Sequence, residues 1–209
     1  MPIRAGPYAA GAMVDERSLI RQSREGDQRA FEQLVNLKRE KAFRIAFNIV
    51  GDEDDARDVA QLAFIRLWRS LSQFDENSRF DPWFFRIVVN LAIDSYRRTQ
   101  KEPRPVEPAG KDEEAAEGGL PAQAAPGADA DLMRGELRAI FNRLATGLAP
   151  AQRAVFTLKE IEGMGTDEIA KVMGIRASTV RNHLLQARRV LQDGLRRAYP
   201  EYCRGRGPR

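Results

Sequence analysis

The sequence predicts an all-α fold of two small helical modules joined by a flexible linker. Apolar residues recur at helical spacing on both sides of residues 101–131, and the first half shows no strand-like alternation. The segment 101–131 itself has five prolines, four glycines and no aromatic residue. It therefore cannot bury enough apolar area to offset the entropy of ordering it.

We divide the chain of 209 residues into five segments: composition marks the linker 101–131, and the outer bounds follow the extent of the family resemblance described below. We expect a disordered N-terminal extension and a basic C-terminal tail, with two helical modules and an acidic linker between them. The linker should let the modules move independently in the free protein. The segments are 1–14 (extension), 15–100 (first module), 101–131 (linker), 132–198 (second module) and 199–209 (tail).

Three helices are expected in the first module, packed as a bundle. Asp27 caps the first helix and Gly51 ends it, while Asp52 opens the second with acidic residues in its first turn. The third begins at Asp81-Pro82, a cap followed by proline, and runs to about Arg98. The apolar faces comprise Phe31, Leu34, Val35, Phe43, Phe47 and Val50 in the first helix, Ala56, Val59, Ala60, Ala63, Leu67 and Leu71 in the second, and Trp83, Ile87 and Leu91 in the third.

The second module carries the pattern of a helix-turn-helix. It follows an amphipathic helix with Leu137, Ile140, Phe141 and Leu144, and another that begins at Pro150 and carries Val155, Phe156 and Ile161. Thr166 is then predicted to cap a short helix over 167–173, and Gly174 to supply the left-handed turn. Ser178 or Thr179 begins the longer helix, which ends near Leu195. Ala170 allows a close crossing of the two helices, and Ile175 and Val180 pin the turn to the core.

Charge and composition restrict the class of protein. The apolar and charged fractions of 43% and 31% are typical of a soluble globular chain, and no run of about 18 apolar residues predicts a spanning helix. We therefore expect a cytoplasmic protein without membrane insertion. The single Cys203 and single His183 make no disulfide framework or zinc site by themselves, so no metal or other cofactor is predicted.

Basic residues gather at the C-terminal end, where a polyanion would be attracted. Residues 176–209 hold nine arginines against Asp193 and Glu201, a net charge of +7 (9 − 2). An arginine run on a helix is commonly just a solvated face. Combined with the placing of Ala170, Gly174 and Val180, however, it favours DNA binding by the second helix.

Both modules together resemble the extracytoplasmic-function sigma factors of bacterial RNA polymerase. In the first module the resemblance lies in GDQRAFEQLV, DEDDARDVAQLAFIRLWRSL and FDPWFFRIVVNLAIDSYRR. In the second it lies in LAPAQRAVFTLKEIEGMGTDEIAKVMGIRASTVRNHLLQAR. The resemblance implies that these modules are sigma regions 2 and 4, and that the protein is not an enzyme but an initiation factor.

The resemblance implies a surface for each partner. The helix 54–71 would dock on the coiled coil of the largest polymerase subunit, and region 4 on the β flap. The acidic linker would follow the RNA exit path. Leu62 departs from the acidic residue that many relatives carry, and Trp68 is expected to pack in the bundle. The implied polymerase contacts are Asp58, Gln61, Phe64, Arg66 and Arg69.

Two DNA elements would be read by different modules. The loop 74–81 and the following helix would capture the melted nontemplate strand at the minus-ten element, using Asn77, Ser78, Arg79, Phe80, Trp83, Arg86, Asn90, Arg97 and Arg98. The last helix would read the minus-thirty-five duplex with Arg176, Ser178, Thr179, Arg181, Asn182, Gln186 and Arg188. His183 and Gln186 stand where relatives often have arginine, which implies a different sequence preference.

Three other functions are alternatives. A LuxR-type regulator shares this helix-turn-helix pattern, but the first half lacks the alternating strands and helices of a receiver domain. A hydrolase could use Asp52, Glu53, Asp54 and Asp55, although helix-start electrostatics explain these carboxylates. An interaction-only adaptor is the third. The resemblance also implies an anti-sigma factor as a partner, which could hold the protein at the inner membrane.

Overall fold

The computed structural model describes residues 15–101 and 140–200, and every regular element within them is a helix, which confirms the all-α class. The first module contains α1 (Glu16–Arg24), α2 (Gln28–Val50), α3 (Glu53–Ser70), the short turn η1 (Leu71–Gln73) and α4 (Phe80–Lys101). In the second module, a helical stretch over 140–145 precedes α6 (Pro150–Phe156), η2 (Thr157–Ile161), α7 (Thr166–Met173) and α8 (Ala177–Ala198). The predictions for the extension, most of the linker and the tail lie outside the described residues.

The predicted caps of α2 and α3 are present. Asp27 accepts hydrogen bonds from the backbone N–H groups of Arg29 and Ala30 at 2.8 and 3.2 Å. Gly51 ends α2 in the left-handed conformation, with φ of 85°. Asp52 caps α3 through the N–H of Asp55 at 2.9 Å. These local interactions fix where one helix ends and the next begins.

Two features of the first module differ from the prediction. Helix α4 begins at Phe80, so Asp81 lies inside its first turn rather than at its cap. Helix α1 was not predicted; Asp15 caps it, and it buries Leu19 and Ile20. Its nine residues are too few for a periodic pattern to stand out from the sequence.

The buried face of α2 is also rotated from the prediction. Phe43, Phe47 and Val50 are only partly buried at the edge of the core. Small side chains on the central face let α3 and α4 approach α2 closely, so bulky aromatic side chains lie at the flanks. The apolar residues buried along α2 are Ala30, Leu34, Ala42, Ile45, Ala46 and Ile49.

The helix-turn-helix forms as predicted, with shifts of one or two residues at its caps. Gly165, not Thr166, is the N-cap of α7, and its N–H donates to Glu168 Oε2 at 3.0 Å. Gly174 adopts the left-handed turn with φ of 65°. Helix α8 begins at Ala177, before the predicted Ser178, and Val180 is buried against the core.

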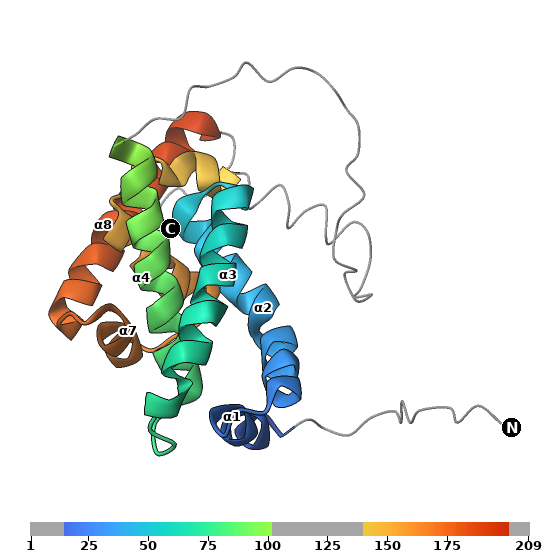
Figure 1. Cartoon of the computed structure of the whole chain (residues 1–209). Helices are drawn as coiled ribbons and strands as arrows, with labels where there is room; N and C mark the ends of the chain where they lie inside the picture. The colour runs from blue at the N-terminus through green and yellow to red at the C-terminus, as the bar shows by residue number, and fades with distance from the viewer. Residues whose placement is uncertain (1–14, 102–139, 201–209) are drawn as a thin grey trace, which may run out of the picture.

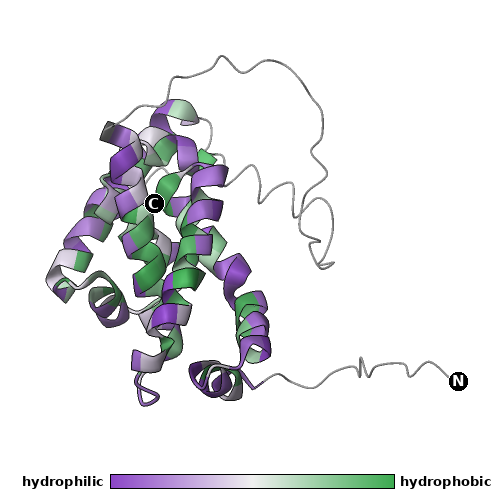
Figure 2. Ribbon diagram, in the orientation of Figure 1, coloured by the Kyte–Doolittle hydropathy of each residue, from purple (hydrophilic) through white to green (hydrophobic). Residues whose placement is uncertain are grey.

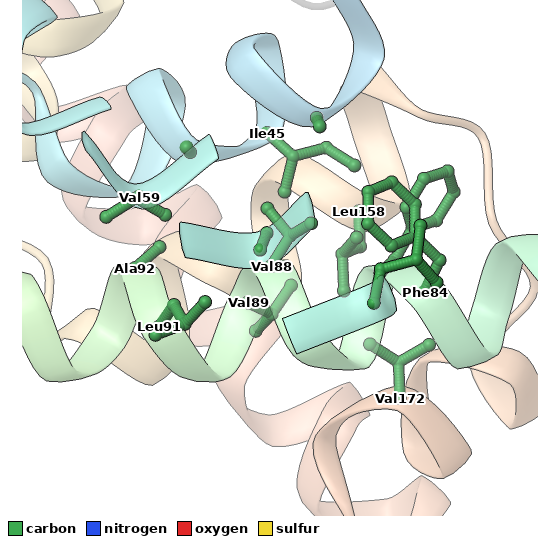
Figure 3. Packing of buried hydrophobic residues seen from close by; sticks show 14 of the residues in the cluster. Ile45, Val59, Phe84, Val88, Val89, Leu91, Ala92, Leu158 and Val172 are labelled. Atoms are coloured by element: carbon green, nitrogen blue, oxygen red, sulfur yellow. The ribbon is translucent and has the colours of Figure 1, made fainter. Parts of the chain in front are cut away.

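The two modules pack against each other, contrary to the prediction of independent movement. In Figure 1, α7 lies beside α4, on the side of it away from most of α3, and α8 packs against α6 and α7. Leu158 and Val172 of the second module belong to the same apolar cluster as Phe84 and Val88 of α4, as Figure 3 shows. Hydrophobic residues line the inner faces of these helices and hydrophilic ones the outer faces (Figure 2). The composition of a linker does not reveal this attraction, because it depends on matching apolar faces far apart in the sequence.

Candidate nucleic-acid interface

The outer face of α3 is exposed and partly apolar. Asp58, Gln61, Arg66 and Arg69 are exposed, as a docking surface requires, whereas Phe64 is partly buried with its ring 5.2 Å from that of Phe84. Phe64 therefore acts mainly in the packing of the bundle.

Sequence reasoning missed the apolar contribution to the same face. Leu62 and Ile65 are 42% and 40% exposed. Trp68, which was expected inside the bundle, is 37% exposed and contacts Phe31 with a ring separation of 4.7 Å. The exposed face of α3 therefore combines apolar area with the polar side chains that the sequence selected.

The loop before α4 is ordered by Asp75, a residue that sequence reasoning did not select. Its Oδ1 accepts from the backbone N–H and the side-chain amide of Asn77, both at 3.0 Å, and the Ser78 hydroxyl donates to Oδ2 at 3.4 Å. The pKa of the Asp75 carboxyl lies below its ordinary value, mainly because the backbone N–H of Asn77 donates a hydrogen bond to it. The carboxylate thus holds two of the predicted strand-binding side chains in one local turn.

A buried lysine anchors the start of α4. Lys38 is 6% exposed, and its ammonium donates to Asp81 Oδ1 at 2.6 Å and Glu16 Oε2 at 2.8 Å. Lys41 adds a longer ion pair with Asp81 at 3.5 Å. These contacts tie α1 and α2 to the first turn of α4, so Asp81 has a positioning role instead of the predicted cap.

One predicted strand-binding aromatic residue is unavailable. Phe80 is 6% exposed and packs edge-on against Phe74, with centroids 5.5 Å apart. It therefore supports the loop and cannot stack on a base in this conformation. Trp83 is half-buried, with its ring 5.0 Å from Phe74, and keeps part of its surface outside the bundle.

A shallow hollow between α3 and α4 brings together side chains that the sequence analysis assigned to polymerase docking and to strand binding. Arg66 and Arg69 of the docking helix face the same space as Trp83, Arg86 and Asn90 of the strand-binding set. An open basic surface with an aromatic edge and an amide suits phosphates and an unpaired base. Arg97 and Arg98 are exposed further along α4 and do not line it. The hollow has a volume of about 530 Å³ and is completed by Ser70, Gln73 and Ile87.

Helix α8 presents a polar face opposite its packed face. Val180 and Ala187 are buried, and Thr179 is partly buried. Arg188 forms an ion pair with Glu160 at 2.6 Å, and Leu185 is an exposed apolar residue among the polar ones. A helix of this kind can enter a major groove with its polar face. The exposed members of the predicted set are Arg176, Ser178, Arg181, Asn182, Gln186 and Arg188.

The acidic residues at the start of α3 have structural tasks. Asp52 caps the helix, and Glu53 and Asp54 form ion pairs with Arg57 at 2.5 and 3.0 Å. Asp55 is buried and accepts a hydrogen bond from the Thr99 hydroxyl at 3.3 Å. This accounts for the cluster without a hydrolase. Within the described ranges, no helix has the length and apolar character needed to cross a membrane.

Comparisons with known proteins agree with this architecture. Residues 34–102 match the model of sigma-70 region 2, and residues 138–191 that of sigma-70 region 4. The chain is 30% identical to the RNA polymerase sigma-H factor of Pseudomonas aeruginosa, over 86% of this chain and 93% of that protein. It is also 30% identical to the ECF RNA polymerase sigma factor SigW of Bacillus subtilis, over 88% and 97% of the two chains.

The overall fold is similar to that of a solved relative. The structure of CnrH in complex with the cytosolic domain of CnrY superposes with a TM-score of 0.62 and 28% identity, covering 86% of this chain and 96% of the other. The match to region 2 over the first module gives no support to a LuxR-type regulator.

Proposed function

The chain belongs to the extracytoplasmic-function sigma factors of the sigma-70 family, and we propose that it binds core RNA polymerase and directs initiation at specific promoters. Its proposed task has three parts: docking on the polymerase, reading the minus-thirty-five duplex and capturing the melted minus-ten strand. The observation that carries the proposal is the hollow between α3 and α4, where three arginines, Trp83 and Asn90 converge.

Docking is assigned to the outer face of α3. Asp58 and Gln61 supply polar contacts there, and the exposed Leu62, Ile65 and Trp68 supply apolar area. An interface of this kind gains affinity from apolar side chains and orientation from the polar rim. Region 4 would make a second contact with the polymerase at the β flap.

Strand capture is assigned to the loop and to the hollow. Ser78, Arg79 and Asn90 are exposed and can hold unpaired bases. Arg66, Arg69 and Arg86 line the hollow and can bind phosphates. Arg66 and Arg69 therefore lie close enough to the strand-binding set to serve the DNA as well as the polymerase. Base capture stabilises the melted state, because binding of the extruded base offsets the free energy spent on unpairing and unstacking it.

Duplex reading is assigned to α8. Arg181, Asn182 and Gln186 are exposed and have donors and acceptors suited to base edges in the major groove. Arg176, Ser178 and Arg188 lie where they can contact the phosphates that fix the helix in the groove.

An anti-sigma factor is proposed as a further partner. The similar chain CnrH was solved with the cytosolic domain of CnrY. The apolar residues exposed on α3 offer such a partner a surface, and covering them would block the docking proposed above.

The proposal is tested by adding the purified chain to core RNA polymerase and sequencing the 5′ ends of transcripts made from a genomic library. We expect stable binding and transcripts that begin downstream of one shared pair of sequence elements. Asp58→Lys should reduce polymerase binding. The matched charge reversal Asp54→Lys, at an exposed position at the start of the same helix, should have less effect. Binding without promoter-directed transcripts would contradict the proposal and favour an adaptor.

A further inference from the structure

The tip of the loop that precedes α4 is tied to helix α1. Arg24, in the last turn of α1, forms an ion pair with Glu76, with Nη1 and Oε1 2.5 Å apart. The hydrogen bond from the Asn77 N–H is the main cause of the lowered pKa of Asp75, and the positive charge of Arg24 lowers this pKa further. Within the described part of region 2, the pair with Arg24 is the one ion pair that joins residues 75–79 to another element.

The base of the same loop is tied to the other end of α1. Glu16, the first residue of α1, accepts a hydrogen bond from Lys38 Nζ at 2.8 Å, and the same ammonium donates to Asp81 Oδ1 at 2.6 Å. The ammonium also lies 5.8 Å from the ring centroid of Phe80, where α4 begins. Because the Lys38 side chain is only 8% exposed, water competes little for these contacts.

Helix α1 connects the two anchor points as one rigid element. It is held in the bundle by the buried Leu19 and Ile20, and Asp15 caps it. Glu16 and Arg24 stand at its two ends, roughly 12 Å apart along the axis at 1.5 Å per residue. In Figure 1, α1 lies at the same end of the bundle as the loop. A single helix of nine residues thus holds the loop at both its tip and its base.

The loop needs such support, because its tip has no regular structure of its own. Residues 75–79 are all exposed and contain no helix or strand, and the hydrogen bonds of Asp75 act only within the tip. A strand that bound a loose loop would have to offset the entropy of ordering it. Contacts that order the loop in advance remove this cost, while Asn77, Ser78 and Arg79 stay exposed for the strand.

We propose that α1 braces the strand-capturing loop in one conformation before DNA arrives, with Arg24 and Lys38 as the positioning residues. The inference rests on the proposed function for the role of the loop. Neither residue belongs to the strand-binding set; Arg24 acts through Glu76, and Lys38 acts through Asp81. When the brace is removed, the apparent affinity for the strand falls to the fraction of molecules whose loop is still correctly placed.

The brace predicts a selective defect. The ion pairs of Arg24 and Lys38 involve Glu16, Glu76 and Asp81, and none of these belongs to the docking face of α3 or the reading face of α8. Polymerase binding and duplex reading should therefore be spared. The sign of the effect at Glu76 separates the brace from a general attraction of DNA to positive charge. Neutralising this carboxylate would strengthen such an attraction, whereas the brace predicts weaker strand capture.

The test compares two full-length variants with the same change of net charge. The brace variant combines Arg24→Gln with Lys38→Met. The control combines Arg21→Gln with Arg39→Met, which alter exposed residues of the same two helices. The two carboxylates that lose Lys38 have side-chain exposures of 38% and 31%, so water can reach them. Glu76→Gln tests the sign of the effect, and Arg24→Lys, which keeps a cation for the ion pair, tests rescue.

Three measurements are made on each protein. Fluorescence anisotropy gives the affinity for core polymerase. Permanganate reactivity of unpaired thymines gives the rate of open-complex formation at equal polymerase occupancy, on a promoter found by the transcript mapping described above. Hydrogen–deuterium exchange of the free chain reports how well the backbone of residues 75–79 is ordered. Circular dichroism checks that helix content is unchanged.

The brace variant should form open complexes at least about fivefold more slowly than the control, with equal polymerase affinity and faster exchange in the loop. Glu76→Gln should also be slower than the wild type, and Arg24→Lys should match it. The inference is overturned by open-complex rates equal to the control, unchanged loop exchange, a gain in Glu76→Gln, or a parallel loss of polymerase affinity.

A second comparison covers a loss of helix content in the brace variant. Arg24→Gln alone is then compared with Arg21→Gln, with a difference of at least about twofold expected because the exposed pair is weaker than the buried one. Equal rates for these two variants would overturn the inference as well. Failure of the proposed function would show instead as a lack of promoter-directed transcripts from the wild type, which does not depend on any of these variants.

Discussion

Arg153 provides the most sensitive test of the contact between the modules. Its side chain rises from α6 and is 2% exposed. Its Nε donates to the carbonyl oxygen of Asn48 at 2.6 Å, and its Nη2 to Asn142 Oδ1 at 2.8 Å. The Asn48 carbonyl lies in the last turn of α2, where no intrahelical donor is available. The perturbation is Arg153→Met, which keeps a long apolar stem and removes the guanidinium.

The expected magnitude follows from these contacts. Two hydrogen bonds to a charged donor contribute about 1.5 to 3 kcal/mol each. Burial lowers the pKa of Arg153, because taking the cation out of water costs free energy, and this cost offsets part of the gain. We therefore expect a net loss of about 2 kcal/mol in the free energy of unfolding, because both oxygen acceptors stay buried without a donor. For a chain of this size that corresponds to a fall of about 4 to 8 °C in the melting temperature.

Thermal unfolding followed by circular dichroism measures the effect. Arg143→Met is the matched control, because Arg143 is exposed in the helical stretch 140–145. We expect the control to melt like the wild type, and Arg153→Met to melt earlier, with region 4 separating from region 2 as a distinct transition. If both variants melted within about 1 °C of the wild type, the buried guanidinium would not contribute to the contact between the modules.

Three further predictions concern the loop, a turn and the recognition helix. The pKa of Asp75 is lowered in the folded chain, so the hydrogen bonds that order its loop should be complete at neutral pH and weaken as the pH falls below the ordinary value of 3.8. Amide NMR of the loop should show this pH dependence in the wild type and lose it in Asp75→Asn. Gly51→Ala should destabilise the chain more than Gly26→Ala in urea unfolding. Both glycines have positive φ, but only at Gly51 would a Cβ atom meet the guanidinium of Arg153, at 2.9 Å. Equal losses of unfolding free energy in the two variants would argue against this contact. Arg181→Ala should weaken binding to the specific promoter by about 1 to 3 kcal/mol more than binding to random duplex, whereas Arg188→Ala should weaken both equally in a mobility-shift assay.

Local signals made most of the fold predictable. Asp27, Gly51 and Asp52 act within a few residues of themselves, so their roles as caps could be inferred from type and spacing. Gly174 was predictable for the same reason, since a left-handed turn between two amphipathic helices favours glycine.

Contacts between distant residues were not predictable in this way. Lys38 looks like a solvated residue in the sequence, yet it is buried between carboxylates from α1 and α4. Phe80 lies in the loop motif beside exposed polar residues, and only the packing of three helices shows that it is buried. The ion pair between Arg44 and Glu162 joins residues 118 positions apart, so no local pattern could reveal it.

Strand capture is the central claim, and it is tested most directly by run-off transcription with a triple variant, Ser78→Ala, Arg79→Ala and Asn90→Ala. None of these residues belongs to the exposed α3 face around Asp58, although Asn90 shares the hollow with Arg66 and Arg69. Affinity for core polymerase should therefore be nearly unchanged. Open-complex formation should fall sharply on a matched promoter and recover on one with a mismatched minus-ten region, since less unpairing then has to be offset. Asp58→Lys should instead reduce transcription on both templates. If the triple variant lost polymerase binding as severely as Asp58→Lys, or were equally defective on both templates, the division of region 2 into a docking helix and a strand-capturing loop would be wrong.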